Sequence, residues 1–227
     1  MPWGSAGTDL VQTMIVLQGR GTQWMGVASR PWFTFLTSNI GCMSVTQQDI
    51  DIITKQLGRT PRGVLEVSYR TPDGQPAVVK TEPKLDDGTP FPTLYYLTDP
   101  RLTAEASRLE VAQAMKWMEA RLNADSDEGE ALRADYKAAH DYFLAKRNAL
   151  HDLGTDFSGG GMPDRVKCLH VLIAYALAEG PQHFRFGTEA VALAAEHGDL
   201  RGSAIPADWP TLADLGITLE QAGEGLA

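Results

Sequence analysis

The sequence predicts an α+β fold, in which a small antiparallel or mixed sheet of about three strands is covered by four to five helices. Two observations carry this prediction. Three short runs rich in β-branched and aromatic residues lie within residues 64–98 and are separated by turn sequences. From residue 103 to 197, apolar residues recur instead every three or four positions. A group of strands followed by a group of helices is typical of an α+β domain.

The composition sets the broad class of protein. A chain of 227 residues with 43% hydrophobic side chains can fill the core of one substantial domain. Its net charge of -9 argues against general nucleic-acid binding, which requires a basic face. Two cysteines cannot form a disulfide framework, so we expect a reducing, cytoplasmic location. No run approaches the roughly 18 apolar residues of a membrane-spanning helix, and we expect no membrane span.

Residues 1–42 differ from the rest of the chain. They hold three of the five tryptophans but only three charged side chains. We interpret them as a disordered extension or as the product of a start site assigned too far upstream, with Met43 as the true start; a functional arm is the alternative. A protein that begins at Met43 should then keep its melting temperature. A single α+β domain would span residues 43–197, followed by an irregular C-terminal tail at 198–227.

The first elements have clear local signals. Thr46 followed by Asp49 forms a capping-box pattern at the start of a helix that Gly58 is placed to end. Residues 64–69 and 76–81 read as two strands joined by the turn at 71–74, which together make a hairpin. Residues 93–98 read as a third strand that ends at an Asp-Pro pair.

Four helices are expected in the second half of the chain. Thr103 would cap one helix that continues to residue 122, and the next would span residues 130–150. Three glycines at 159–161 lead to Pro163, a residue suited to the first position of a helix. This helix would continue to residue 178 with few polar side chains and would therefore be buried. A shorter amphipathic helix follows at 188–197.

Several long strings identify a family resemblance. The strings QLGR (56–59), PRG (61–63), DGTPFPTLYYLT (87–98) and GGMPDRVKCLH (160–170) resemble the actinobacterial family called domain of unknown function 501. The resemblance covers about residues 46–195 and implies no activity. Members of the family are often encoded near enolase, a septum-formation-initiator protein and an exopolyphosphatase. This context implies a connection to cell division or to phosphate metabolism.

The chain departs from the family pattern at its cysteines. The resemblance implies cysteines where this sequence has Thr71, Asp73 and Asp99, together with one that matches Cys168. Four thiolates would suit zinc, whereas two carboxylates and a hydroxyl make a harder and weaker set of ligands. We therefore expect no metal, no cofactor and an unreactive thiol at Cys168.

The glycine loop before the third of these helices suggests an anion site. Arg165 and Lys167 would lie in the first turn, where backbone N–H groups are unpaired and the helix dipole is positive. The loop lacks the Gly-Lys-Ser/Thr ending of a nucleoside-triphosphate loop. The alternative is an ordinary helix cap, with Arg165 paired to a carboxylate of another helix. The candidate ligand-binding residues come from this loop, from the loop after the first helix and from the third strand: Gly160, Gly161, Asp164, Arg165, Lys167, Arg59, Arg62 and Tyr95.

Two functions from different classes remain open at this stage. One is a site for a small phosphorylated ligand, with or without catalysis, which requires Arg59, Arg62, Arg165 and Lys167 to converge on one pocket. His170 and His140 are the candidate catalytic residues, although a buried histidine is more often a hydrogen-bonded core residue. The other is a non-enzymatic interaction protein of cell division or septum formation, which would dock an acidic partner protein on a flat basic patch.

Overall fold

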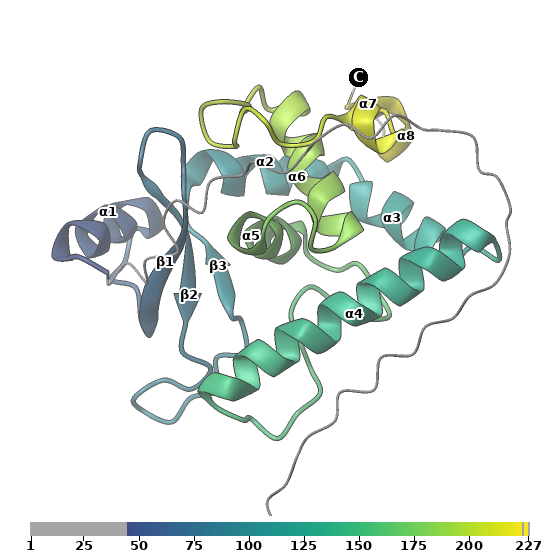
Figure 1. The fold of residues 1–227 in the computed structure, drawn as a ribbon. Coiled ribbons are helices and arrows are strands. Elements are labelled where there is room, and N and C mark those ends of the chain that lie inside the picture. The colour runs from purple at the N-terminus through teal and green to yellow at the C-terminus, as the bar shows by residue number, and fades with distance from the viewer. Residues whose placement is uncertain (1–44, 224, 227) are drawn as a thin grey trace, which may run out of the picture. The chain divides into compact units, whose positions relative to one another are not determined.

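The computed structural model describes residues 45–223, 225 and 226 (Figure 1). These residues belong to one compact unit. The predictions for residues 1–42 and for a start at Met43 lie outside the described residues. Within the described part of the chain, no helix is long and apolar enough to cross a membrane.

The structure confirms the α+β fold. Its sheet consists of β1 (Val64–Arg70), β2 (Pro76–Thr81) and β3 (Tyr95–Leu97), all antiparallel and in the order β1-β2-β3. β1 and β2 form the predicted hairpin. β3 lies at one edge of the sheet, where Tyr95 pairs with Lys80 and Leu97 with Val78.

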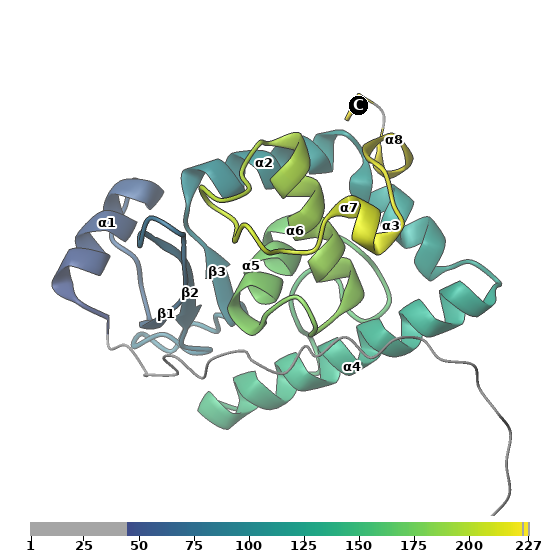
Figure 2. The ribbon, with the colours of Figure 1, turned by 45° about the horizontal axis from the view of Figure 1, so that its top comes forward.

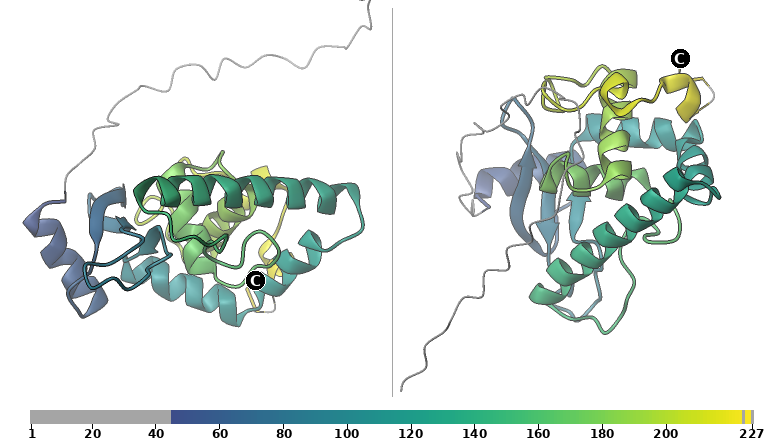
Figure 3. Two further views of the ribbon diagram at one scale, coloured as in Figure 1. Left: turned by 90° about the horizontal axis from the view of Figure 1, so that it is seen from below. Right: turned by 45° about the vertical axis from the view of Figure 1, so that its right-hand side comes forward.

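Helices pack on both sides of the sheet. They are α1 (Gln47–Leu57), α2 (Pro100–Val111), α3 (Ala114–Leu122), α4 (Asp127–Leu150), α5 (Leu169–Glu179), α6 (Arg185–His197), α7 (Leu212–Leu215) and α8 (Leu219–Ala222). α1 lies on one side of the sheet, and α5 lies on the other, where it contacts β3, α2 and α6 (Figure 2). The long helix α4 extends across α5 and α6 (Figure 3).

The predicted ends of α1 are confirmed. Thr46 and Asp49 form a reciprocal capping box, and Gly58 ends the helix in the left-handed conformation. The expected helix from Thr103 to Leu122 is wrong in two respects. Asp99 is the N-cap, because its carboxylate accepts hydrogen bonds from the backbone N–H groups of residues 101 and 102. The helix is also interrupted: α2 and α3 are separate helices, with Gln113 between them in the left-handed conformation at a φ of 69°.

The expectation that a helix begins at Pro163 is also wrong, because α5 begins at Leu169. The glycine segment before it folds back on its own backbone. The N–H of Arg165 donates to the carbonyl of Gly161 at 2.9 Å, and the N–H of Lys167 donates to the carbonyl of Gly160 at 2.7 Å. Gly160 and Gly161 both have positive φ, which permits these tight turns.

The hydrophobic core continues beyond residue 197. Trp209, Leu212, Ile217, Ala222 and Leu226 are buried in the same cluster as the sheet and the central helices. The segment after α6, which the sequence predicts as an irregular tail, therefore contributes two short helices and part of the core.

Candidate functional site

A cleft of about 590 Å³ opens where the end of α1, the edge strand β3, one side of α2 and the start of α5 meet. We call it the central cleft. Its walls carry many hydroxyl groups, a thiol and an imidazole: the lining residues are Gln56, Leu57, Thr93, Tyr95, Tyr96, Leu97, Thr98, Pro100, Thr103, Ala104, Ser107, Cys168, His170 and Val171. A concave site that combines apolar walls with a few polar groups is typical of small-molecule binding.

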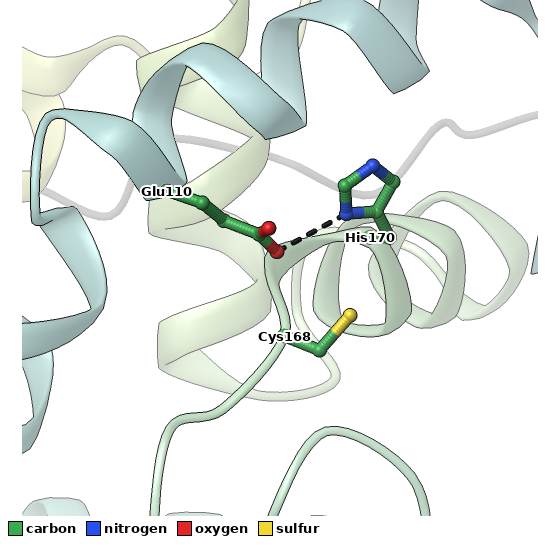
Figure 4. A group of neighbouring side chains, drawn as sticks. All are labelled: Glu110, Cys168 and His170. Atoms are coloured by element: carbon green, nitrogen blue, oxygen red, sulfur yellow. Dashed lines mark hydrogen bonds and ion pairs between the residues drawn. The ribbon is translucent and has the colours of Figure 1, made fainter.

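Three side chains with chemical reactivity lie close together beside this cleft (Figure 4), and two of them, Cys168 and His170, line it. Glu110 comes from the last turn of α2, Cys168 is the N-cap of α5, and His170 lies in the first turn of α5. Their potential ligand atoms all lie within 4.8 Å of one another. The local fold explains this arrangement: the backbone N–H of Leu169 donates to Glu110 Oε1 at 2.7 Å, which joins the start of α5 to the end of α2.

The imidazole of His170 is held from both ring nitrogens. Its Nδ1 lies 3.1 Å from Glu110 Oε1, and its Nε2 lies 3.4 Å from Ser107 Oγ. A hydrogen bond with Cys168 and then one with Glu110 raise the pKa of His170 to about 9, against the opposing effect of burial. His170 is not a fully buried core residue, since 28% of its side chain is exposed and the residue lines the cleft.

A second, smaller pocket of about 280 Å³ adjoins the central cleft. We call it the arginine pocket, because Arg59 and Arg62 line it together with Phe91. Leu57 and Tyr96 are walls of both cavities. Arg62 also forms an ion pair with Asp87, and the two side chains are 55% and 53% exposed.

The four predicted cationic residues do not converge on one pocket. Arg59 and Arg62 line the arginine pocket, whereas Arg165 and Lys167 are exposed and line neither that pocket nor the central cleft. The backbone N–H of Arg165 is already bonded within the glycine segment, so this N–H is not an unpaired donor for an anion. Among the described residues, the guanidinium of Arg165 forms no ion pair, so the structure does not show the alternative pairing with a carboxylate of another helix. Asp164 instead borders a separate small hollow with Arg133 and Lys137. Arg165 and Lys167 do not lie at a helix N-terminus, because α5 begins only at Leu169.

Two further candidates have structural roles. Tyr95 is 3% exposed, and its hydroxyl donates to Glu179, so the tyrosine that faces the two cavities with a partly exposed ring is Tyr96. His140 is buried with its Nδ1 2.8 Å from Ser158 Oγ, and burial lowers its pKa. It is therefore a neutral, hydrogen-bonded core residue.

The three positions at which the resemblance implies further cysteines lie apart from Cys168. The hydroxyl of Thr71 donates to Asp73, and Arg101 lies 2.8 Å from Asp99 and 4.0 Å from Asp73. Asp99 caps the start of α2, whereas Cys168 lies beside Glu110 at the other end, about 16 Å away along the helix axis. In this chain the four positions do not form one metal site.

The sequence-based reasoning missed Glu110 and Ser107, and of the two neighbouring tyrosines it selected Tyr95 rather than Tyr96. Ser107 and Glu110 are three residues apart and therefore lie on the same side of α2. The Cys-x-His spacing at 168–170 is a local signal for the other half of the cluster. Nothing local connects the two halves, because they meet only when α2 packs against α5.

The fold and the central cleft define a single-sheet α+β protein with a concave site of mixed apolar and polar lining beside its edge strand. The chain belongs to the family described as Protein of unknown function (DUF501), whose model matches residues 67–192, more than half of the chain. The matched region includes the whole Glu110–Cys168–His170 cluster. No curated protein and no solved structure matches the chain.

Proposed function

We propose that this protein binds a small phosphate-type anion in the arginine pocket, with the rest of the ligand extending into the central cleft. The observation that carries this proposal is the pair Arg59 and Arg62 in a concave pocket with Phe91 and Tyr96. Guanidinium groups bind phosphate through two parallel N–H donors, and an aromatic wall excludes water from one side. In a chain with a net charge of -9, a pocket lined by two arginines is a local positive region that would attract an anionic ligand.

Arg59 is the main cation of this proposal. Arg59 is exposed and, among the residues that the structure describes, forms no ion pair. Arg62 is already bound to Asp87, and hydrogen bonds from Thr89 followed by those from Arg62 lower the pKa of Asp87 to about 2. A bound anion would compete with this carboxylate for Arg62. Arg59 would therefore contribute more to ligand affinity than Arg62.

The two adjoining cavities favour an elongated ligand, and an aromatic pair lies where they meet. Phe91 and Tyr96 have ring centroids 6.2 Å apart and an angle of 34° between their planes. Because Tyr96 also borders the central cleft, a ligand with its phosphate at Arg59 can reach the thiol and imidazole at the far end only if it is elongated. An extended phosphorylated metabolite fits this arrangement better than inorganic phosphate alone.

The test is a calorimetric titration of the full chain with inorganic phosphate, pyrophosphate and tripolyphosphate. Arg59→Ala should weaken binding by about 10- to 100-fold, because one charge-assisted interaction is worth roughly 1.5–3 kcal/mol. Arg165→Ala is the matched control, since Arg165 is an exposed arginine outside both cavities. It should leave the affinity unchanged.

The two variants give opposite answers for the two anion sites. Loss of binding in Arg165→Ala with normal binding in Arg59→Ala would show that the anion binds at the glycine segment, and would refute the proposal. Absence of binding of all three anions to the wild-type protein would refute it as well.

A further inference from the structure

We propose that Glu110, Cys168 and His170 form a binding site for a divalent transition-metal ion of the zinc class, with a fourth coordination position open to the central cleft (Figure 4). This inference does not rest on the arginine pocket. It reverses the expectation that the sequence supports no metal, an expectation that considered Cys168 without Glu110.

The types of ligand atom favour zinc over harder cations. A thiolate, an imidazole and a carboxylate are the three kinds of side chain that bind zinc in proteins, whereas magnesium and calcium prefer oxygen ligands throughout. Sites with three protein ligands keep a position for water or substrate, unlike structural sites with four. Here Cys168 and His170 line the central cleft, so the remaining position would face the space in which a ligand binds.

The distances require little movement of the side chains. With metal–ligand bonds of about 2.0–2.1 Å in a tetrahedral site, an oxygen and a nitrogen ligand lie roughly 3.3 Å apart. Glu110 Oε1 and His170 Nδ1 are 3.1 Å apart. The sulfur of Cys168 lies within 4.8 Å of one ligand atom of each of these two side chains and is attached to a short side chain at the N-cap of α5. A small rotation of this thiol would complete the three-ligand set.

The surroundings of His170 suit a metal ligand. If Nδ1 binds the metal, the proton of the neutral ring is on Nε2, which lies 3.4 Å from Ser107 Oγ. Ser107 donates its own proton to the carbonyl of Thr103 at 3.0 Å, so its oxygen is free to accept from Nε2. Metal-binding histidines commonly donate their second N–H in this way, which fixes the tautomer and the orientation of the ring.

Glu110 is also held in position from behind. The backbone N–H of Leu169 donates to Oε1 at 2.7 Å, and a carboxylate oxygen has a second lone pair available for a metal. The same contacts could serve only as a helix cap with a histidine–carboxylate pair. In that structural explanation the thiol is only a hydrogen-bond partner of His170, and the experiment therefore uses a metal–thiolate bond as its main readout.

The experiment is a titration of the metal-free full chain with Co²⁺ at mildly alkaline pH, followed by displacement with Zn²⁺. We expect one Co²⁺ per chain, with the near-ultraviolet absorption of a cobalt–thiolate bond that Zn²⁺ removes. Cys168→Ser should abolish this absorption. His170→Gln and Glu110→Gln should each weaken metal affinity by more than about 100-fold, and Ser107→Ala by about 10-fold, as changes outside the ligand set do.

Matched controls separate this site from other thiols and histidines. Cys42→Ser and His151→Gln, at the second cysteine and at an exposed histidine, should leave the absorption and the affinity unchanged. Each variant is checked by circular dichroism. In the Cys42→Ser protein, Zn²⁺ should also slow the alkylation of Cys168, a measurement that keeps all three ligands intact.

Three results would overturn the proposal: cobalt binding without the thiolate absorption, equal affinity in wild type and His170→Gln, or alkylation that Zn²⁺ does not slow. The titrations contain no phosphate, and the phosphate titrations are carried out with a metal chelator present. Failure of the metal site is therefore distinguishable from failure of the anion site.

Discussion

Asp49 connects the first helix to the sheet through a single carboxylate. Both of its oxygens accept hydrogen bonds from Arg70 at the end of β1, at 2.8 and 2.9 Å. One of them also accepts from the backbone N–H of Thr46 and completes the capping box of α1. The side chain is 5% exposed, so this ion pair is shielded from water far more than a surface pair.

This pair should make stability depend on pH. The hydrogen bonds with Arg70, more than any other contact, hold the pKa of Asp49 well below its usual range. Because the folded pKa is lower than the unfolded value of about 4, the stabilisation is fully present above pH ~4 and is lost progressively as pH falls below it. At neutral pH, Asp49→Asn should reduce the free energy of unfolding by about 1.5–3 kcal/mol.

Urea unfolding of wild type and Asp49→Asn across a series of pH values measures this effect. The difference between the two proteins should shrink as the pH drops below ~4. Asp51→Asn, an exposed position on the same helix, is the control and should change stability little at any pH. A difference for Asp49→Asn that stays constant down to acid pH would contradict the assignment of the stabilisation to the charged pair.

At the level of elements, the glycine segment before α5 permits close packing that a side chain would prevent. A Cβ on Gly161 would lie 2.7 Å from the carbonyl oxygen of Arg165 and 2.9 Å from Lys167 Cγ. A Cβ on Gly159 would lie 2.6 Å from Val171 Cγ1. These glycines allow the segment to lie close to itself and to α5, which explains the glycine run without any bound anion.

Two substitutions separate steric fit from backbone strain. Gly161 and Gly154 both have positive φ, but a Cβ on Gly154 would have no atom within 4 Å. Gly154→Ala should cost only the strain of the left-handed conformation, about 1–2 kcal/mol. Gly161→Ala should cost a further ~1–3 kcal/mol, because the added methyl group overlaps the backbone. Chemical denaturation of both variants checks this, and equal losses would show that the close approach at Gly161 is unimportant.

At the level of the whole molecule, one core joins the sheet, the central helices and the C-terminal segment. Trp209 is 5% exposed and its indole N–H donates to the carbonyl of Thr188 in α6 at 3.2 Å. Leu212 and Leu226 are buried in the same cluster. The last part of the chain therefore covers α6 and should unfold together with the rest of the domain.

Trp209→Ala tests this dependence. Removing a buried tryptophan costs about 3–5 kcal/mol, so the variant should unfold at a markedly lower temperature. Phe157→Ala is the control, because 61% of this aromatic residue is exposed and its removal should change stability by less than about 0.5 kcal/mol. Thermal unfolding by circular dichroism measures both. A loss for Trp209→Ala as small as that for Phe157→Ala would show that the C-terminal segment is a dispensable appendage.

The sequence by itself determined those features that depend on neighbouring residues. The capping box of Thr46 and Asp49, the helix end at Gly58, the hairpin of β1 and β2 and the overall α+β class all follow from local backbone preferences and short-range periodicity. Family membership also follows from the sequence alone, through the match over residues 67–192. The arginines of the loop after α1 were also identified as binding candidates from the sequence, although their pocket was not.

Only the tertiary structure decided where chemical groups meet. Glu110 and Leu169 are 59 residues apart, and no periodicity in the sequence predicts that α2 presents its last turn to the start of α5. The start of α5 was misplaced because hydrogen bonds within the glycine segment replace the expected first turns of the helix. Helix packing and long-range hydrogen bonds depend on the shape of the whole core, and for that reason the cluster in the cleft became visible only in the folded chain.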